Sequence, residues 1–495
     1  MIVLTGNDLS IEQVVAVARD REQVGLDESA CERVRQSRAL VEKYVEENRI
    51  VYGITTGFGK FSDVLIDPCD VSALQHNLIK SHCCAVGELL PIEVVRAMML
   101  IRANSLIKGN SGIRLSVIEL MIKMLNSGLH PHVPSQGSLG ASGDLAPLAN
   151  MVLPLIGEGS AEYQGKVYHG ADALAQIGEK PVKLVAKEGL ALINGTQAMT
   201  AIAALLVHDS EELMRYAIRA SAMTFEALLG IGAALDPRVH EARNQSGQIA
   251  VAKALREELK GSKLLSEQGE LRVQDAYSLR CAPQVLGASY DAIAYVRQIV
   301  EREINAATDN PLIFSNESDA ISAGNFHGQP VALAMDFLKI ALSEIANISE
   351  RRIERLVNPC LSNGLPGFLV HQPGLQSGFM IVQYSAASLV SENKVLAHPA
   401  SVDSIPSSGN QEDHVSMGTT AARQARMIYN NSLYVVMMEM MVAAQALEFR
   451  EKDKMAPLTR RTYDAVRRVV KSFDCDRVVN TDIEALKQAA EDRLI

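Results

Sequence analysis

The sequence contains no tryptophan, and aromatic residues make up only 4% of its 495 positions. The interior of the folded chain must therefore consist mainly of aliphatic side chains. Long uninterrupted apolar runs are also missing: the most apolar stretch, "NNSLYVVMMEMMVAAQALEF", contains Glu439 and Gln445, which argues against a membrane span. The first residues, "MIVLTGNDLSIEQVV", lack the basic and apolar regions of a signal peptide. We therefore expect a soluble protein of the cytoplasm that has no membrane partner.

Cysteine spacings that indicate a disulfide framework or a structural zinc site are absent as well. The seven cysteines are odd in number and contain no C-x-x-C pair, which suits a reducing compartment. Basic residues are outnumbered, with 48 Lys and Arg against 58 Asp and Glu, so that the formal net charge is -10. A negative chain has no general attraction to phosphate backbones. We therefore expect no nucleic-acid partner.

Helix signals run through most of the chain. Ser10 and Gln13 have the spacing of a capping box ahead of an apolar helical pattern. Pro91, a favoured first-turn residue, begins another helical stretch, which stops at Gly109. The best strand signal is the alternation "AEYQGKVYH" around Gly165, which predicts a surface hairpin. The predicted fold class is therefore mainly α.

Long apolar helical stretches without interior proline follow from residue 196, over 196–229, 334–358 and 414–451. As one helix the last would be about 57 Å long, whereas a compact chain of this size has a radius of gyration of about 23 Å. Long helices with aliphatic surfaces usually pack into bundles. We therefore expect an N-terminal domain over residues 1–200, a long-helix bundle over residues 201–495, and a homo-oligomer.

The segment "HPHVPSQGSLGASGDLAPLAN" places small residues ahead of an acid. One interpretation is an ordinary loop in which Ser142 or Asp144 caps the following helix. A phosphate cradle is a second, although neither the Lys-Ser/Thr of a P-loop nor a preceding strand is present. In a third, the Gly143 nitrogen attacks the Ala141 carbonyl and Ser142 loses water, which leaves an electrophilic methylidene. Glycine permits that close approach, and Asp144 could serve the proton transfers.

Several blocks of the sequence together resemble one known family. "GSLGASGDLAPLA" is similar to the signature of the aromatic amino-acid ammonia-lyases, which build a methylidene-imidazolone (MIO) from Ala-Ser-Gly. The other blocks, in family order from residue 51 to about 418, are "VYGITTGFGKF", "LINGTQAM", "VQDAYSLRCAPQVLG", "GNFHGQP", "QYSAASLVSENK" and "SIPSSGNQEDHVSMG". The resemblance implies an aspartase/fumarase-like helical architecture, in which the smaller N-terminal domain carries the MIO loop. It also implies a homotetramer with active sites shared between subunits.

Among the members of this family, the sequence most resembles those that act on histidine. The resemblance rests on Ser81-His82 in "LIKSHCCAVG" and on "NQEDHVSM". The implied reaction eliminates ammonia from L-histidine to give trans-urocanate. The MIO, formed from Ala141-Ser142-Gly143, would serve as the electron sink for the amino group while a base removes the β-proton. No dissociable cofactor is implied. Cys83-Cys84 depart from the family pattern, in which smaller residues are expected.

The resemblance assigns roles to individual residues. Tyr52 resembles the catalytic base, carried on a mobile lid with glycine hinges. Glu412 resembles the carboxylate that bonds the substrate imidazole or takes part in proton transfer, and which of the two removes the β-proton stays open. His82 would face the substrate ring. The other implied pocket residues are Asn194, a donor beside the substrate carboxylate and the MIO; Arg280, a clamp on the carboxylate; Phe326, an apolar wall; and Gln274 and Tyr277, which a helix would place on one face with Arg280.

Two other functions stay open. A tyrosine or phenylalanine ammonia-lyase, or an aminomutase, would use the same MIO. A helical scaffold without activity would leave Ala141-Ser142-Gly143 unmodified. A metal site is not expected, because the consecutive residues Glu412, Asp413 and His414 would point about 100° apart on a helix. His130-Pro131-His132, a second possible ligand pair, is more typical of a loop.

Overall fold

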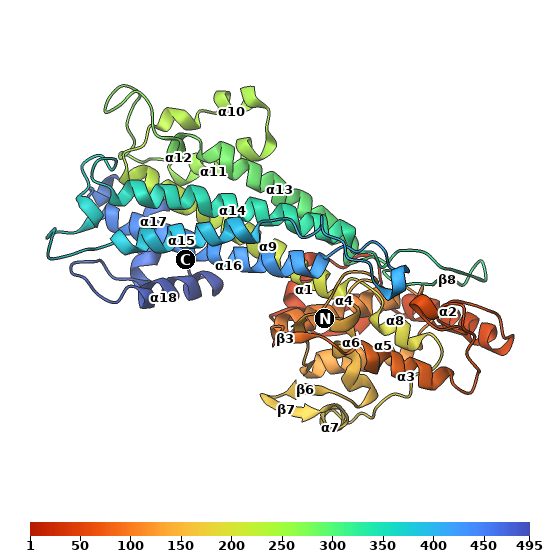
Figure 1. Ribbon diagram of the computed structural model, residues 1–495. Helices are drawn as coiled ribbons and strands as arrows, with labels where there is room; N and C mark the ends of the chain where they lie inside the picture. Colours follow the sequence, from red (N-terminus) through yellow and green to blue (C-terminus); the bar gives the residue numbers. More distant parts are fainter. The chain divides into compact units, whose positions relative to one another are not determined.

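The computed structural model describes all 495 residues and divides them into two compact units (Figure 1). The first unit comprises residues 1–208, 296–336 and 399–423, and the second comprises residues 209–295, 337–398 and 424–495. Four of the five boundaries between the units fall inside long helices, and the fifth, between residues 398 and 399, follows α15 (Met380–Leu396). The four helices are α9 (Gln197–Ala227), α13 (Ala282–Glu303), α14 (Gln329–Val357) and α16 (Gly418–Leu447). The domain boundary expected near residue 200 stays a prediction.

Helices dominate both units, as the sequence predicted. The remaining helices of the first unit are α1 (Ile11–Ala18), α2 (Glu28–Glu46), α3 (Val71–His82), α4 (Ile92–Ile107), α5 (Leu115–Ser127), α6 (Leu145–Val152), α7 (Gly170–Gln176) and α8 (Glu188–Ile193). Those of the second unit are α10 (Pro237–Arg243), α11 (Ser246–Glu258), α12 (Tyr277–Arg280), α15 (Met380–Leu396), α17 (Pro457–Val469) and α18 (Asn480–Glu491). None of these helices combines the length and the hydropathy that a membrane span requires.

The strands are short and form four small sheets. The strands are β1 (Ile2–Leu4), β2 (Val24–Leu26), β3 (Val86–Leu89), β4 (Leu129–Pro131), β5 (Pro134–Gln136), β6 (Ser160–Tyr163), β7 (Lys166–His169), β8 (Leu312–Phe314) and β9 (Asp319–Ile321). Strands β1 and β2 are parallel, while β3–β5, β4–β6–β7 and β8–β9 pair antiparallel. The predicted hairpin is confirmed: β6 and β7 flank Gln164 and Gly165, which both have positive φ angles, as a two-residue hairpin turn requires.

Local helix signals are confirmed where they depend only on neighbouring residues. The Ser10 hydroxyl accepts a hydrogen bond from the Gln13 amide, and Oε1 of the Gln13 side chain accepts one from the Ser10 amide, so a capping box begins α1. Pro91 directly precedes α4, although as its N-cap rather than its first residue. Helix α5 ends at Gly128 in the left-handed conformation, which glycine adopts without steric cost.

The long helices of the second unit are joined through a buried charged group. Glu439 of α16, fully buried, accepts hydrogen bonds from Arg352 of α14 at 2.5 and 2.7 Å. The same carboxylate also accepts from Ser349 at 2.6 Å and from Thr224 of α9 at 2.8 Å. A buried carboxylate with this many donors is compensated, which explains how the apolar stretch of α16 contains an acid.

Three helices of the first unit, α3, α6 and α8, pack against one another. Helix α3 ends at His82, α6 begins after Asp144, and α8 ends before Asn194. Three residues that the sequence singled out therefore lie at the ends of one packed group of helices. Their side chains are placed by helix termini, where backbone groups are unpaired and a chain segment can change direction.

Candidate active site

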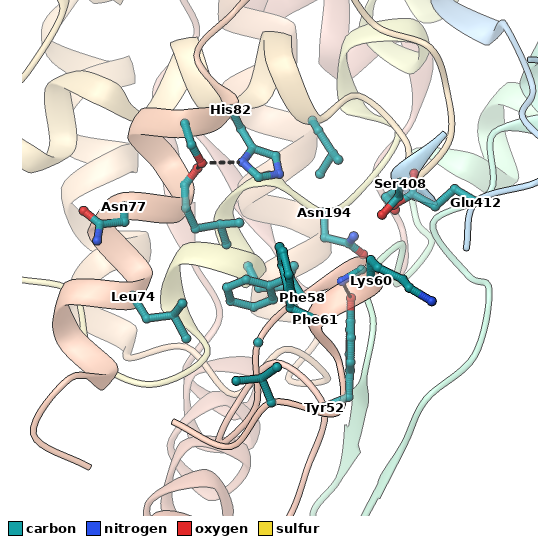
Figure 2. A pocket seen from close by; sticks show the side chains of 18 of the residues that line it. Tyr52, Phe58, Lys60, Phe61, Leu74, Asn77, His82, Asn194, Ser408 and Glu412 are labelled. Atoms are coloured by element: carbon teal, nitrogen blue, oxygen red, sulfur yellow. Dashed lines mark hydrogen bonds between the residues drawn. The ribbon is translucent and has the colours of Figure 1, made fainter. Parts of the chain in front are cut away.

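One cavity of about 720 Å³ in the first unit is lined by residues from five separate segments. The residues predicted from the sequence that line it are Tyr52, His82, Ser142, Asn194 and Glu412. Figure 2 shows His82, Asn194, Tyr52 and Glu412 arranged around this space, with Phe58 and Phe61 among the apolar side chains. Its volume suits a small organic molecule rather than a polymer.

Ser142 lies where this cavity meets a smaller one. The smaller cavity, of about 240 Å³, is lined by Gly137 to Gly143 together with His82, Cys84 and Glu412. Ala141 and Gly143 are buried while Ser142 is partly exposed, and Gly143 has a φ of +74°. The serine hydroxyl is therefore presented to the cavities on a backbone that bends in a way most residues avoid. These features fit the predicted ring closure.

The side chain of Asp144 does not cap the helix that follows it. Asp144 occupies the N-cap position of α6, but its carboxylate accepts no hydrogen bond from that helix. It accepts instead from the amide of Met199 at 2.8 Å, from the hydroxyl of Ser138 at 2.8 Å, and from the hydroxyl of Thr419. The interpretation of Asp144 as an ordinary cap is therefore wrong, because tertiary donors compete successfully for the carboxylate.

Burial dominates the electrostatics of Asp144. The side chain is fully buried, which raises its pKa, although the bonds from Thr419, Met199 and Ser138 act in the opposite direction. A carboxyl group with a raised pKa below the Ala-Ser-Gly segment can hold or release a proton more readily near neutral pH than an exposed aspartate. This fits the predicted role of Asp144 in proton transfer.

Glu412 faces the same cavity from a short irregular segment. Its backbone forms an isolated antiparallel bridge with Ser407, and the Ser407 hydroxyl lies 3.5 Å from Oε2. Burial raises the pKa of Glu412, while hydrogen bonds from the hydroxyls of Ser407 and Ser142 lower it in part. The carboxylate therefore lies within reach of both the loop that contains Ser142 and any ligand in the cavity.

Tyr52 lies on a segment rich in glycine. Its hydroxyl accepts a hydrogen bond from the amide of Gly59 at 3.2 Å, and its ring packs edge-on against Phe58. Burial raises the pKa of Tyr52, and the nearby charge of Glu412 raises it further. Tyr52 is consequently a neutral phenol at neutral pH in this conformation.

His82 ends α3 with its ring directed toward the cavity (Figure 2). Its Nδ1 lies 3.0 Å from the hydroxyl of Ser81, which leaves Nε2 for a ligand that enters the cavity. Burial lowers the pKa of His82, so the ring is neutral at neutral pH. Next to it, burial raises the pKa of the Cys83 thiol to about 12, whereas Cys84 is exposed.

The predicted pocket residues outside the Ala-Ser-Gly loop that do not line this cavity are Gln274, Tyr277, Arg280 and Phe326. Gln274, Tyr277 and Arg280 belong to the second unit, and Phe326 lies in the first unit outside the lining. Only Tyr277 and Arg280 share the short helix α12, with the guanidinium 4.5 Å from the tyrosine ring centroid. Gln274 precedes the helix, so the expectation of one helical face for all three is wrong. Tyr277 is 71% exposed.

The cavity also contains polar residues that the sequence reasoning missed. They are Lys60, Asn77 and Ser408, while Ser138 and Thr419 bond the carboxylate of Asp144. Asn77 and Ser81 are four residues apart on α3. This spacing puts both on one helical face near His82 and could have predicted Asn77 as a cavity residue. Thr419 carried no such signal, because only the tertiary fold brings it to Asp144.

The arrangement combines a serine hydroxyl, a carboxyl group with a raised pKa, a neutral imidazole and a phenol around one cavity. These groups can donate, accept and transfer protons on a small substrate. No cluster of three or more His, Cys, Asp or Glu side chains with the geometry of a metal site occurs in the structure. The chemistry that these residues support by themselves is acid-base chemistry.

Comparison with known proteins identifies the relatives of this chain. The model of the family described as aromatic amino acid lyase matches residues 9–468. A histidine ammonia-lyase from Alkaliphilus oremlandii is 59% identical over 482 residues, which cover 97% of this chain and 95% of that protein. The crystal structure of a histidine ammonia-lyase from Trypanosoma cruzi has 41% identity and a TM-score of 0.92, covering 99% of this chain and 93% of that one. A tyrosine aminomutase from Streptomyces globisporus has 38% identity and a TM-score of 0.96, covering 100% and 97%.

Proposed function

The chain belongs to the aromatic amino acid lyase family, and on this premise we propose that it is a histidine ammonia-lyase. It eliminates ammonia from L-histidine and releases trans-urocanate. The observation that carries the proposal is that His82 and Glu412 line the same cavity as Ser142. Two groups that can hydrogen-bond an imidazole therefore lie beside the residue from which the electrophile would form.

The residues of the 141–143 loop fit the predicted MIO. Ser142 reaches the cavities, and Gly143 has the left-handed backbone that lets its nitrogen approach the carbonyl of Ala141. When formed from these residues, the MIO supplies an electron sink for the amino group of the substrate. Asp144, buried below the loop with a raised pKa, would exchange the protons that ring closure and loss of water require.

The other cavity residues would bind and orient histidine. Neutral His82 offers Nε2 to one nitrogen of the substrate imidazole, and Glu412 accepts a hydrogen bond from the other or receives a proton. Asn194, whose buried Oδ1 has no partner within the chain, faces the polar end of the substrate. Tyr52 and Glu412 are both in position to take the β-proton, and the raised pKa of Glu412 makes it a stronger base than an exposed carboxylate.

Two measurements on the purified protein test this function. Incubation with L-histidine should yield trans-urocanate and ammonia, whereas phenylalanine and tyrosine should react far more slowly. Peptide mass across residues 135–150 should be lower than the encoded mass by two waters, which is what the MIO requires. An unmodified peptide together with no urocanate would favour the non-enzymatic scaffold.

An aminomutase is the second candidate, because a tyrosine aminomutase shares the fold of this chain at a TM-score of 0.96. Such an enzyme would return the ammonia to the other carbon of the product. Product identification separates the two: a β-amino acid as the main product would replace the lyase assignment, while urocanate with free ammonia supports it.

We further propose that the active protein is a homotetramer in which a second copy completes each site. The cavity is lined only by residues of the first unit, whereas Arg280, the implied carboxylate clamp, belongs to the second unit. The apolar residues Ile381, Tyr384 and Val395 of α15 are exposed and share one helical face, as an interface between copies would require. Co-expression of Arg280→Met with Tyr52→Phe should restore activity that neither variant has alone. The mass of the wild-type assembly in solution should correspond to four copies of the chain.

A cytoplasmic location is also proposed. All seven cysteines are free, and four of them are exposed, which suits a reducing compartment. Cell fractionation that recovers the protein outside the cytosolic fraction would contradict this.

A further inference from the structure

Arg102 is a fully buried cation whose hydrogen bonds go to no carboxylate, although the nearby charge of Asp309 acts on it. It lies on α4, and its guanidinium donates to oxygen atoms of a neighbouring segment: Nη1 donates to the carbonyl of Asn194 and to Oε1 of Gln197, both at 2.9 Å. Nη2 donates to the carbonyl of Ala191. Burial lowers the pKa of Arg102 to about 10, so the group stays charged at neutral pH.

Two of the oxygen atoms that Arg102 binds lie where α8 ends. Ala191 is in the last turn of this helix, and Asn194 is its C-cap residue. Carbonyl groups at a helix C-terminus have no helical donor and carry the negative end of the helix dipole. A guanidinium group that bridges two such carbonyls holds the end of the helix in one position.

The segment after α8 is fixed against Arg102 with no spare room. A Cβ atom on Gly195 would lie 2.5 Å from Nη1 of Arg102 and 2.4 Å from Oε1 of Gln197. The Gln197 side chain is held in turn, because its Nε2 donates to Thr308 at 2.7 Å. The backbone of residues 194–195 therefore cannot shift toward α4, and it cannot move away without breaking charge-assisted hydrogen bonds.

This fixed backbone carries two groups of the candidate site. The side chain of Asn194 lines the cavity, and its buried Oδ1 has no partner within the chain. A buried oxygen without a partner is unfavourable, and a donor group of a ligand in the cavity would remove that cost. The carbonyl of Gly195 accepts the amide of Asp144 at 2.6 Å, which connects the same segment to the Ala-Ser-Gly loop.

We infer that Arg102 is a positioning residue of the reaction: from behind the cavity, it holds the amide of Asn194 in the orientation that meets the substrate. The inference rests on the proposed ammonia-lyase function. Arg102 itself does not line the cavity, so it acts through the segment that it holds, in which Asn194 is the residue that lines the cavity. Its loss should therefore lower activity while the MIO still forms.

Arg96 of α4 provides a matched control. It is also buried, at 2% exposure, and it also donates only to neutral groups: Nε and Nη2 bond the carbonyl of Val17, and Nη1 bonds the carbonyl of Leu125. Nη1 additionally lies 3.2 Å from Nε2 of His130. None of these partners lines the cavity. Arg96→Met therefore removes the same kind of buried interaction at a place that does not carry Asn194.

The test compares Arg102→Met with Arg96→Met in thermal stability, peptide mass over residues 135–150 and kcat/KM for histidine. Both variants should lose stability and keep the loss of two waters. Only Arg102→Met should lose about 100-fold in kcat/KM, the scale expected for a misplaced substrate contact. Arg102→Lys, which keeps a charge but bridges fewer carbonyls, should lose about tenfold, and it serves as the test if Arg102→Met does not fold.

A double-mutant cycle shows whether Arg102 acts through Asn194. Adding Asn194→Ala to Arg102→Met or to Arg102→Lys should cost much less than Asn194→Ala alone, because the amide is already misplaced. Additive losses, or equal losses of activity in the Arg96 and Arg102 variants, would overturn the inference while leaving the function intact. A wild-type protein that does not convert histidine would overturn the function, and the inference with it.

Discussion

A Cβ atom on Gly143 would lie 2.1 Å from the carbonyl oxygen of Gly195. The two residues form an isolated parallel bridge, and the same carbonyl accepts the amide of Asp144 at 2.6 Å. The loop that contains Ser142 and the segment around Gly195, which are far apart in the sequence, therefore meet backbone to backbone. Packing therefore requires glycine at position 143, in addition to the proposed ring closure.

Gly143→Ala should destabilise the protein and block the loss of water at the loop. The left-handed φ alone costs about 1–2 kcal/mol for alanine, and the contact with Gly195 should raise the total to about 3 kcal/mol or more. Gly178→Ala is the control, because Gly178 has a φ of +73° but no atom within 4 Å of its added Cβ. Denaturant unfolding and peptide mass check both variants. If both lose the same free energy of unfolding, the contact between residue 143 and Gly195 adds nothing to the cost of the left-handed φ.

Ser142→Ala should abolish turnover with little effect on folding. The hydroxyl that must leave as water is absent, and its removal from a loop costs about 1 kcal/mol at most. Peptide mass over residues 135–150 should show the encoded mass. Ser138→Ala is the neighbouring control: it removes a bond to Asp144 but should still show the two-water deficit. If folded Ser142→Ala turns over histidine at the wild-type rate, the reaction does not use an electrophile formed from Ser142.

Glu412→Gln should lower kcat by about 100-fold or more, as loss of an acid-base group does. Because burial raises the pKa of Glu412, the ionised form exists only above a pH higher than for an exposed glutamate. Activity that requires the carboxylate should therefore fall as the pH is lowered through this raised pKa, and the variant should lack that acidic limb. The pH dependence of kcat/KM measures it.

Glu303→Gln is the control for that pH profile. Burial also raises the pKa of Glu303, and the charge of Asp144 raises it further, but Glu303 does not line the cavity. The acidic limb should persist in this variant. If kcat/KM of Glu412→Gln still falls at acidic pH, the titrating group that controls activity is another residue.

His82→Leu should reduce the preference for histidine over phenylalanine. A buried substrate nitrogen would lose its partner, at a cost of about 1–3 kcal/mol, or roughly 5- to 150-fold in the ratio of kcat/KM values. Phenylalanine has no ring nitrogen to lose such a bond. His76→Leu is the control on the same helix, because His76 bonds the Leu184 amide at 3.1 Å and does not line the cavity. If the ratio of kcat/KM for histidine and phenylalanine does not change, His82 does not bind the substrate ring, and Glu412 alone would account for the preference.

Local signals predicted the parts of the fold that depend on neighbouring residues. The capping box of Ser10 and Gln13 and the hairpin around Gly165 are confirmed, because each is satisfied within a few residues of chain. The same reasoning failed for Gln274, which an extended helical spacing placed with Tyr277 and Arg280. Helix α12 begins only at Tyr277 and has no side-chain cap, and so short a helix is marginal by itself, so that tertiary contacts set its limits.

The sequence by itself determined the chemistry of the candidate site: the Ala141-Ser142-Gly143 segment, the acid after it, and the blocks that contain Tyr52, His82 and Glu412. Only the tertiary structure decided what surrounds them. In the folded chain, the Asp144 carboxylate accepts hydrogen bonds from Met199 and Thr419 rather than from α6, and Gly195 packs against Gly143. These contacts join segments far apart in the chain, and their energies depend on burial and approach distance, which no local pattern of residues records.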